Sequence, residues 1–279
     1  MNAAVRPDTT LGFVELFAAA AEGFAVNVAW SDLRARVPGC PDWTAYDLVV
    51  HLGNVHAWAA TIVETGRPAA EQNDEPRSGK PRVVSEWYAG KAEDLYEVLR
   101  AAPADRATWN FAYGAGVAAF WQRRQVHETT IHRIDLDLAS GRDSEPVDPR
   151  VAADGVDEVL TVFGHRMASR GHPARLDRSL MLTATDTGDT WLVSPPTREH
   201  GSSVVPAQPS TSPAEQPPVD VRRGAAEHER AGAARDRVEG PADALYRLLW
   251  RRSGLDDGTV RVEGDETRVR AFLGSRLVP

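Results

Sequence analysis

The stretch Arg124-Gln-Val-His-Glu128-Thr-Thr-Ile-His132-Arg-Ile-Asp135 predicts a helix that carries a pair of metal ligands. Glu128 and His132 are four residues apart, so their side chains project from the same face of a helix. A third donor, His51, stands in an earlier helical stretch, Asp47-Leu-Val-Val-His51-Leu-Gly-Asn54. Two imidazoles and one carboxylate between helices leave one coordination position open, as catalytic zinc sites do.

Each of these side chains also has a simpler interpretation. Glu128 and His132 have the spacing of an ordinary hydrogen bond or ion pair on a partly exposed helix. His51 has apolar neighbours, so it also fits a core histidine that is hydrogen-bonded within the fold. The residues taken alone leave both interpretations open.

The charged and imidazole neighbours of the motif are ambiguous in the same way. Arg124 precedes Glu128 by four residues and Asp135 follows His132 by three, so either can orient a ligand from behind. Both also fit a salt-bridge ladder on the helix surface. His127 is one residue before Glu128 and points about 100° away around the helix, and His56 lies off the face of His51. We therefore expect His127 and His56 to be surface or structural residues.

The segments around the motif predict an antiparallel four-helix bundle, an architecture that commonly builds metal sites from facing side chains. Thr44 followed by Asp47 resembles a capping box that starts the second helix. Proline and glycine in the stretch from Val37 to Trp43 predict a fixed loop before it. The four helices are expected at about Thr9 to Asn27, Ala45 to Thr65, Val83 to Pro103 and Val117 to Gly141, with a polar loop from Arg67 to Pro81.

The pattern changes after Pro149 and predicts a smaller α+β domain. We assign residues 1–148 to the bundle and residues 149–279 to this second domain. Residues 196–237 are rich in Pro, Ser, Ala, Glu and Arg with few large apolar side chains, a composition that predicts disorder. The expected elements are a helix from Val151 to Met167, strands at Ser179 to Thr185 and Thr190 to Ser194, a helix from Pro241 to Trp250, a strand from Thr259 to Glu263 and a helix from Glu266 to Leu273.

Composition excludes several classes of protein. The formal charge is −8, from 32 basic and 40 acidic residues, with no dense basic cluster, so nucleic acid is not an expected partner. No stretch approaches the ~18 apolar residues of a membrane span, and the first ten residues do not read as a signal peptide. The single cysteine, Cys40, excludes an internal disulfide. We therefore expect a soluble, cytoplasmic protein.

Several separate motifs, in the right order, resemble the mycothiol-dependent maleylpyruvate isomerase-like proteins of actinobacteria. They are Val37-Pro-Gly-Cys-Pro-Asp-Trp-Thr44, Asp47-Leu-Val-Val-His51-Leu, the stretch from Arg124 to Asp135, Gly240-Pro-Ala-Asp-Ala-Leu-Tyr-Arg-Leu-Leu-Trp250-Arg-Arg252 and Val262-Glu-Gly-Asp265. The resemblance implies a DinB-like metal-binding four-helix bundle followed by the C-terminal domain of the family. The long, biased segment from Pro195 to Arg237 departs from the family, whose connection is shorter.

By this resemblance His51, Glu128 and His132 fall on the zinc ligands of the family. Arg252 falls near a C-terminal arginine that the family uses in its active site, where a guanidinium would bind an anionic group of the substrate or thiol. Position alone supports equally well a cation that stabilises the end of a helix. Trp58 and Trp121 stand in the helices that bear the candidate ligands, so they are candidates for lining the cofactor pocket.

Coordination to zinc, or to another divalent metal, deprotonates a thiol, which makes the open position suitable for activating mycothiol. The expected function is therefore transfer of mycothiol to an electrophilic small molecule, or reversible use of the thiol for cis-trans isomerisation. The alternatives are a non-catalytic metal-binding or ligand-sensing protein and a thiol-independent metal hydrolase. We expect a monomer or homodimer, with no membrane partner.

Overall fold

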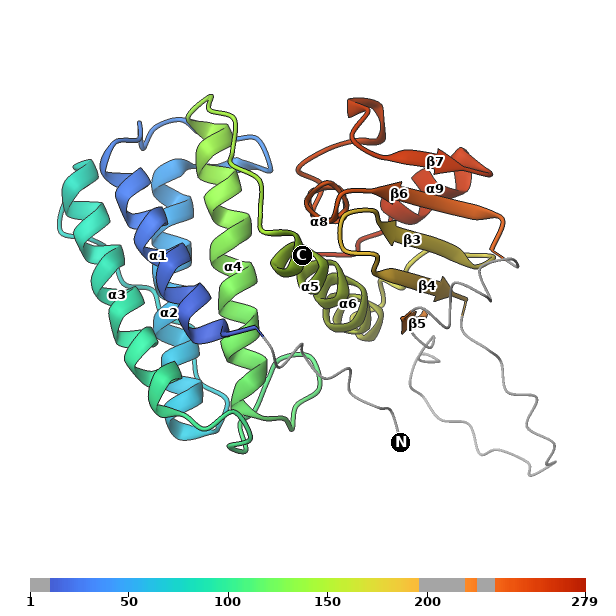
Figure 1. Cartoon of the computed structure of the whole chain (residues 1–279). Helices are drawn as coiled ribbons and strands as arrows, with labels where there is room; N and C mark the ends of the chain where they lie inside the picture. The colour runs from blue at the N-terminus through green and yellow to red at the C-terminus, as the bar shows by residue number, and fades with distance from the viewer. Residues whose placement is uncertain (1–10, 196–218, 225–233) are drawn as a thin grey trace. The chain divides into compact units, whose positions relative to one another are not determined.

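The computed structural model describes residues 11–195, 219–224 and 234–279. The chain divides into two compact units, Met1–Val147 and Asp148–Pro279 (Figure 1). Within the described residues no helix is both long enough and apolar enough to cross a membrane.

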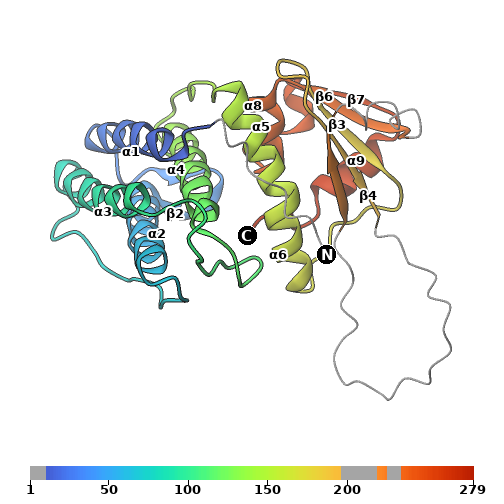
Figure 2. The same ribbon diagram turned by 60° about the horizontal axis from the view of Figure 1, so that its bottom comes forward.

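Four helices form the first unit, as the spacing of apolar residues predicted (Figures 1 and 2). The expected start of the first helix, at Thr9, lies outside the described residues. The boundaries of the second helix are those expected from its capping signals. The helices are α1 (Phe13–Ala29), α2 (Ala45–Thr65), α3 (Pro81–Ala101) and α4 (Ala118–Ala139).

Both ends of α2 are set by local chemistry. Thr44 Oγ1 accepts a hydrogen bond from the Asp47 amide at 3.3 Å, and the Asp47 carboxylate accepts one from the Thr44 amide at 2.8 Å. This reciprocal capping box satisfies two amides that the first turn leaves without helical partners. At the other end Gly66 has a φ of 72°, a left-handed conformation that glycine adopts without steric cost.

The expectation of an antiparallel bundle is wrong in one respect: the helices do not alternate in direction along the chain, because two pairs of them run parallel. Side chains near the end of α1 contact the end of α4, with Asn27 Nδ2 3.4 Å from Asp137 Oδ1, so these two helices run parallel. Arg106, just beyond α3, donates to the Glu64 carbonyl at the end of α2 at 2.6 Å, so α2 and α3 also run parallel. The segment 66–80 is long enough to return along the bundle, and a connection of this length permits parallel neighbours.

The predicted loop before α2 is a β-hairpin. Strand β1 (Arg36–Val37) pairs antiparallel with β2 (Cys40–Thr44), with Val37 opposite Cys40 across the Pro38-Gly39 turn. Proline and glycine signalled the turn correctly, but the pairing of the residues on either side was not apparent from their composition. The hairpin places Trp43 immediately before α2.

A buried polar network joins three helices in the core of the bundle. The His56 side chain is fully buried, with Nδ1 2.8 Å from Gln125 Oε1 and Nε2 3.1 Å from the Tyr88 hydroxyl. In the neutral ring, Nδ1 donates to Gln125 and Nε2 accepts from Tyr88. His56 is therefore structural. Burial disfavours its charged form and lowers the pKa of His56 to about 4, although the hydrogen bond to Gln125 acts in the opposite direction.

This network predicts a loss of stability in mild acid. Between pH 6.5 and about 4 an unfolded His56 binds a proton that the folded protein excludes, so the free energy of unfolding falls as the pH falls. The two pKa values differ by an amount worth about 3 kcal/mol. In urea titrations of metal-free protein, the stability advantage of the wild type over His56→Phe should shrink by roughly this amount across the interval. Parallel pH profiles would contradict the assignment.

The second unit combines helices with a mixed sheet. Strands are ordered β5-β4-β3-β6-β7, and β3 pairs parallel with β6 while the other neighbours are antiparallel. This confirms the predicted class, a four-helix bundle followed by an α+β part. The elements are α5 (Pro149–Glu158), the π-helix η1 (Val159–Phe163), α6 (Gly164–Ser169), β3 (Leu180–Ala184), β4 (Thr190–Ser194), β5 (Asp220–Arg223), β6 (Asp236–Gly240), α8 (Ala242–Leu249), a 3₁₀ turn (Leu255–Asp257), β7 (Arg261–Glu263) and α9 (Glu266–Leu273).

Strand β5 lies within the segment 196–237, much of which was predicted to be disordered, and β6 begins at the end of that segment. Strand β5 pairs with β4, with Arg223 opposite Trp191 and Val221 opposite Val193, and β6 begins at Asp236. These positions form strands, and disorder of the rest of the segment stays a prediction. The sequence did not reveal these strands because they contain few apolar residues. They form because hydrogen bonds to β4 and β3 compensate part of the entropy lost when the chain is ordered. The rest of the segment, 196–218 and 225–233, lies outside the described residues.

Candidate metal centre

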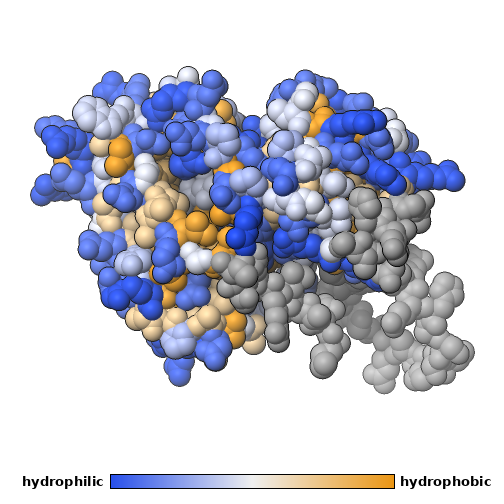
Figure 3. Space-filling model, in the orientation of Figure 1, coloured by the Kyte–Doolittle hydropathy of each residue, from blue (hydrophilic) through white to orange (hydrophobic). Residues whose placement is uncertain are grey.

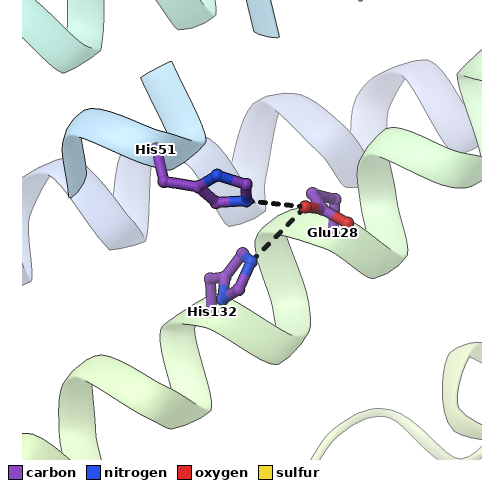
Figure 4. A group of neighbouring side chains, drawn as sticks. All are labelled: His51, Glu128 and His132. Atoms are coloured by element: carbon purple, nitrogen blue, oxygen red, sulfur yellow. Dashed lines mark ion pairs between the residues drawn. The ribbon is translucent and has the colours of Figure 1, made fainter. Parts of the chain in front are cut away.

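The three predicted ligands converge, although they come from distant parts of the sequence. His51 projects from α2 toward Glu128 and His132 of α4 (Figure 4). Glu128 Oε1 lies 3.5 Å from His51 Nε2 and 3.4 Å from His132 Nε2. One donor atom from each residue lies within 4.8 Å of the other two, and this is the only such group of His, Cys, Asp or Glu within the described residues. The distances are short enough for one divalent ion to draw in all three atoms.

Glu128 presents its two oxygens to different partners. Oε2 forms an ion pair with the guanidinium of Arg124, whose side chain is only 3% exposed, while Oε1 faces the two histidines. Burial alone would raise the pKa of Glu128. The positive charge of Arg124 and the hydrogen bonds to His132 and His51 outweigh burial and hold the pKa well below its usual range. The carboxylate is therefore ionised, as a metal ligand must be.

His132 is oriented by a buried carboxylate. Its Nδ1 donates to Asp135 Oδ2 at 3.0 Å, and this leaves Nε2 directed toward Glu128. Burial opposes the protonated form, but the two carboxylates, Asp135 and Glu128, prevail and raise the pKa of His132 to about 9. A carboxylate behind an imidazole is the usual support of a metal-ligating histidine. Two roles were left open for Asp135, orientation of His132 and a salt bridge on the helix surface. The buried hydrogen bond to His132 favours the first.

Exposure of the three side chains decreases from His51 to His132. The exposed fractions are 36% for His51, 14% for Glu128 and 9% for His132, so the group opens to solvent beside His51. The indole of Trp43 lies against this opening, with its ring centroid 4.7 Å from that of His51 and 6.5 Å from that of His132. Trp43 was not among the residues predicted for the site. Its position just before the capped start of α2 is the signal that would have placed it near His51.

The other predicted cofactor residues of this unit, Trp58 and Trp121, form an aromatic cluster further along the same two helices. Their rings meet edge to face at a centroid distance of 5.1 Å. The indole of Trp58 donates to the Ala69 carbonyl at 2.9 Å, and that of Trp121 to the Trp109 carbonyl at 2.7 Å. Each is seven residues from a candidate ligand, which is roughly 10 Å along a helix axis. The structure thus brings them to each other and not to the three donors.

His127 belongs to neither group. It is fully buried, as a structural residue is, and the surface alternative for it is wrong.

Arg252 belongs to the second unit and follows α8. Its Nη1 donates to the Trp250 carbonyl at 2.6 Å, and its guanidinium carbon lies 6.0 Å from the centroid of the Trp250 ring. The neighbouring Arg251 has a left-handed φ of 61° and donates to the Ser275 carbonyl. That hydrogen bond ties Arg251 to the C-terminal end of its own unit.

Comparisons with known proteins show what this chain is similar to in sequence and in fold. Residues 14–137 match the family model described as the mycothiol maleylpyruvate isomerase N-terminal domain. The fold is similar to that of the crystal structure of the mycothiol-dependent maleylpyruvate isomerase, with a TM-score of 0.56 and 12% sequence identity over 90% of this chain and 91% of that one. A histidine-to-alanine mutant of that enzyme gives a TM-score of 0.55 and 11% identity over the same shares. No curated protein matches the sequence.

The matched residues reach from α1 to α4 and include the three candidate ligands. Over residues 14–137 the first unit is thus similar to the mycothiol maleylpyruvate isomerase N-terminal domain.

Proposed function

We propose that the protein is a zinc-dependent enzyme that uses mycothiol, as an S-transferase to an electrophilic small molecule or as a cis-trans isomerase. The observation that carries the proposal is the convergence of His51, Glu128 and His132 inside a domain that matches this family model. Imidazole and carboxylate donors suit zinc and also other divalent transition metals. A three-donor set leaves a position for an exogenous ligand.

The protein residues around the three donors would hold them ready for the ion. Arg124 neutralises one oxygen of Glu128 and leaves the other directed to the centre. Asp135 fixes the ring of His132 so that Nε2 faces inward. Trp43 gives the open side beside His51 an apolar wall that limits access of water. A zinc ion bound to these donors would supply the positive charge that converts a coordinated thiol to its thiolate.

The two reactions share their first step and differ in the fate of the product. A thiolate adds to an activated double bond, and rotation about the new single bond followed by loss of the thiolate gives isomerisation. If the carbon–sulfur bond persists after protonation of the carbanion, the result is S-transfer. The chain needs no cysteine of its own for either reaction, in keeping with its single Cys40 in β2.

Metal analysis and a thiol-dependent assay test the proposal together. Purified full-length protein should contain near-stoichiometric zinc or another divalent metal by elemental mass spectrometry. Consumption of electrophiles should then require mycothiol and stop when the metal is removed by chelation. Turnover without thiol would favour a metal hydrolase. Metal without any turnover would favour the ligand-sensing alternative, and failure to bind metal after reconstitution would overturn the proposal.

A change at Arg252 tests its assigned contact with an anionic group. Arg252→Ala should raise the KM for thiol or electrophile by about 10- to 100-fold, the effect of losing a charge-assisted hydrogen bond. Metal content should stay constant, and Arg252→Lys should recover part of the loss, since it retains the charge but not the bidentate geometry. Loss of metal from Arg252→Ala would instead indicate a structural role.

A further inference from the structure

The outward side of the α1 and α3 pair forms an apolar groove that the candidate metal centre does not use. The groove has a volume of about 970 Å³ and is lined by 15 residues of the first unit. Two of them, Trp30 and Val26, are 84% and 56% exposed. Figure 3 shows apolar residues gathered over the part of the bundle where α1 lies. The three candidate ligands are on the other two helices, α2 and α4.

Four of the lining residues on α1 and four on α3 are separated by steps of four, three and four. This spacing is typical of a seam between two packed helices. The core of the bundle uses different positions on the same helices, including Phe24, Val84 and Tyr88, which are buried, while the buried Phe17 lies at one end of the groove. The groove is therefore a second, outward seam. Its positions are Ala18, Glu22, Ala25 and Ala29 on α1, and Arg82, Glu86, Ala89 and Glu93 on α3.

The two seams share a common centre. The midpoint of the first lies between Glu22 and Ala25, and that of the second between Glu86 and Ala89. Contacts between the antiparallel helices bring these midpoints to the same level, since Ser85 Oγ donates to the Ala25 carbonyl at 2.7 Å and the Phe24 and Tyr88 rings lie 4.7 Å apart. A twofold axis at this level, perpendicular to the helices, would lay each helix antiparallel on its copy.

Under this twofold axis the seams are self-complementary in size and charge. Arg82 meets Glu93 of a second copy, and Glu93 meets its Arg82. Within one chain these two residues are 11 positions apart, roughly 16 Å along α3, so they cannot pair with each other. Neither makes an ion pair within the described residues. The remaining positions pair a large side chain with a small one, or two small ones: Glu22 with Ala25, Glu86 with Ala89, and Ala18 with Ala29.

We infer that the groove is the interface of a homodimer, in which α1 and α3 of two copies form an antiparallel four-helix seam. Alanines allow close approach of the helices, and the twofold axis seats the exposed Trp30 at the Phe17 end of the second groove. Buried Trp and Tyr side chains are the usual anchors of such interfaces. The groove is lined by 15 residues, fewer than the ~20–30 residues a side of an interface of standard size, so the contact falls at the small end of stable interfaces.

Charge reversal tests this inference with the full-length protein. Wild type should have the mass of a dimer in sedimentation velocity. Arg82→Glu and Glu93→Arg should each weaken the dimer by about tenfold or more, because both symmetry-related contacts then join like charges. When the two variants are mixed, both contacts again join opposite charges, so a heterodimer should form at the wild-type concentration. Asp94→Arg, an exposed change of the same charge on α3 outside the groove, should leave the dimer intact.

The mixing result separates this interface from others. A monomeric wild type would overturn the inference. The groove would then be covered by another protein or by a terminal segment of the chain. Dimers that persist in both single variants would place the interface elsewhere and overturn it as well. Since the substituted residues are exposed, the variants should keep the helical content of the wild type, measured by circular dichroism, and its metal content. A variant that loses helical content or metal is replaced by Trp30→Asp. The metal centre lies on α2 and α4 and does not require the dimer. If the protein proves to be monomeric, the proposed function is therefore unaffected.

Discussion

Replacing His132 with alanine is expected to remove stoichiometric metal and catalytic turnover together. His132 is the least exposed of the three candidate ligands, and Asp135 already holds its Nε2 toward the centre. Loss of a partner that only orients a ligand costs about 10- to 100-fold in metal affinity, so loss of the ligand itself should cost more than about 100-fold. Elemental mass spectrometry of the purified variant and a competition titration of zinc against a chelator would measure both effects.

Asp135→Asn is the matched control for this substitution. It keeps the size of the side chain but removes the charge that orients and polarises the His132 ring, so it should reduce metal affinity by about 10- to 100-fold while leaving measurable binding. His127→Ala changes a histidine on the same helix whose ring is not part of the centre and should retain metal. Full metal in His132→Ala would mean that the ion, if any, binds elsewhere.

Glu128→Ala is expected to lower stability as well as metal binding, even in metal-free protein. The Arg124 side chain is 3% exposed and pairs with Glu128 across one helical turn. Removing the carboxylate takes its ion-pair partner Glu128 from the buried Arg124 guanidinium and weakens the hydrogen bonding of both histidines. Breaking a buried ion pair from one side costs about 3–5 kcal/mol. Urea denaturation in the presence of a chelator would measure this loss separately from the contribution of bound metal.

A double variant tests the physical cause of that loss. Arg124→Met combined with Glu128→Leu removes both charges and fills similar volumes, so it should recover most of the stability while still binding no metal. A Glu128→Ala variant with wild-type stability would show that Arg124 reaches solvent or finds another carboxylate. If the double variant were as unstable as the single one, lost packing and not the broken ion pair would be the cause.

Local signals predicted the elements of the first unit well because they act within a few residues. The capping box of Thr44 and Asp47 and the glycine at position 66 specify both ends of α2 without reference to the rest of the chain. The β-hairpin at Arg36–Thr44 and strand β5 were missed because strand pairing depends on a partner that composition does not reveal. The parallel course of α2 and α3 likewise depends on the route of the segment 66–80 across the bundle.

The spacing of Glu128 and His132 is a property of the chain itself, since helix geometry alone puts residues four apart on one face. The capped start of α2 and the heptad-like steps of α1 and α3 are equally local. Packing of α2 against α4 brings His51 to that pair, sets Trp43 over its ring and buries Arg124 behind Glu128. It also brings Gln125 to His56, while packing of α1 against α3 aligns the centres of the two outward seams. These contacts join residues far apart in sequence, so they form only when the folded bundle compensates the entropy of ordering the chain between them.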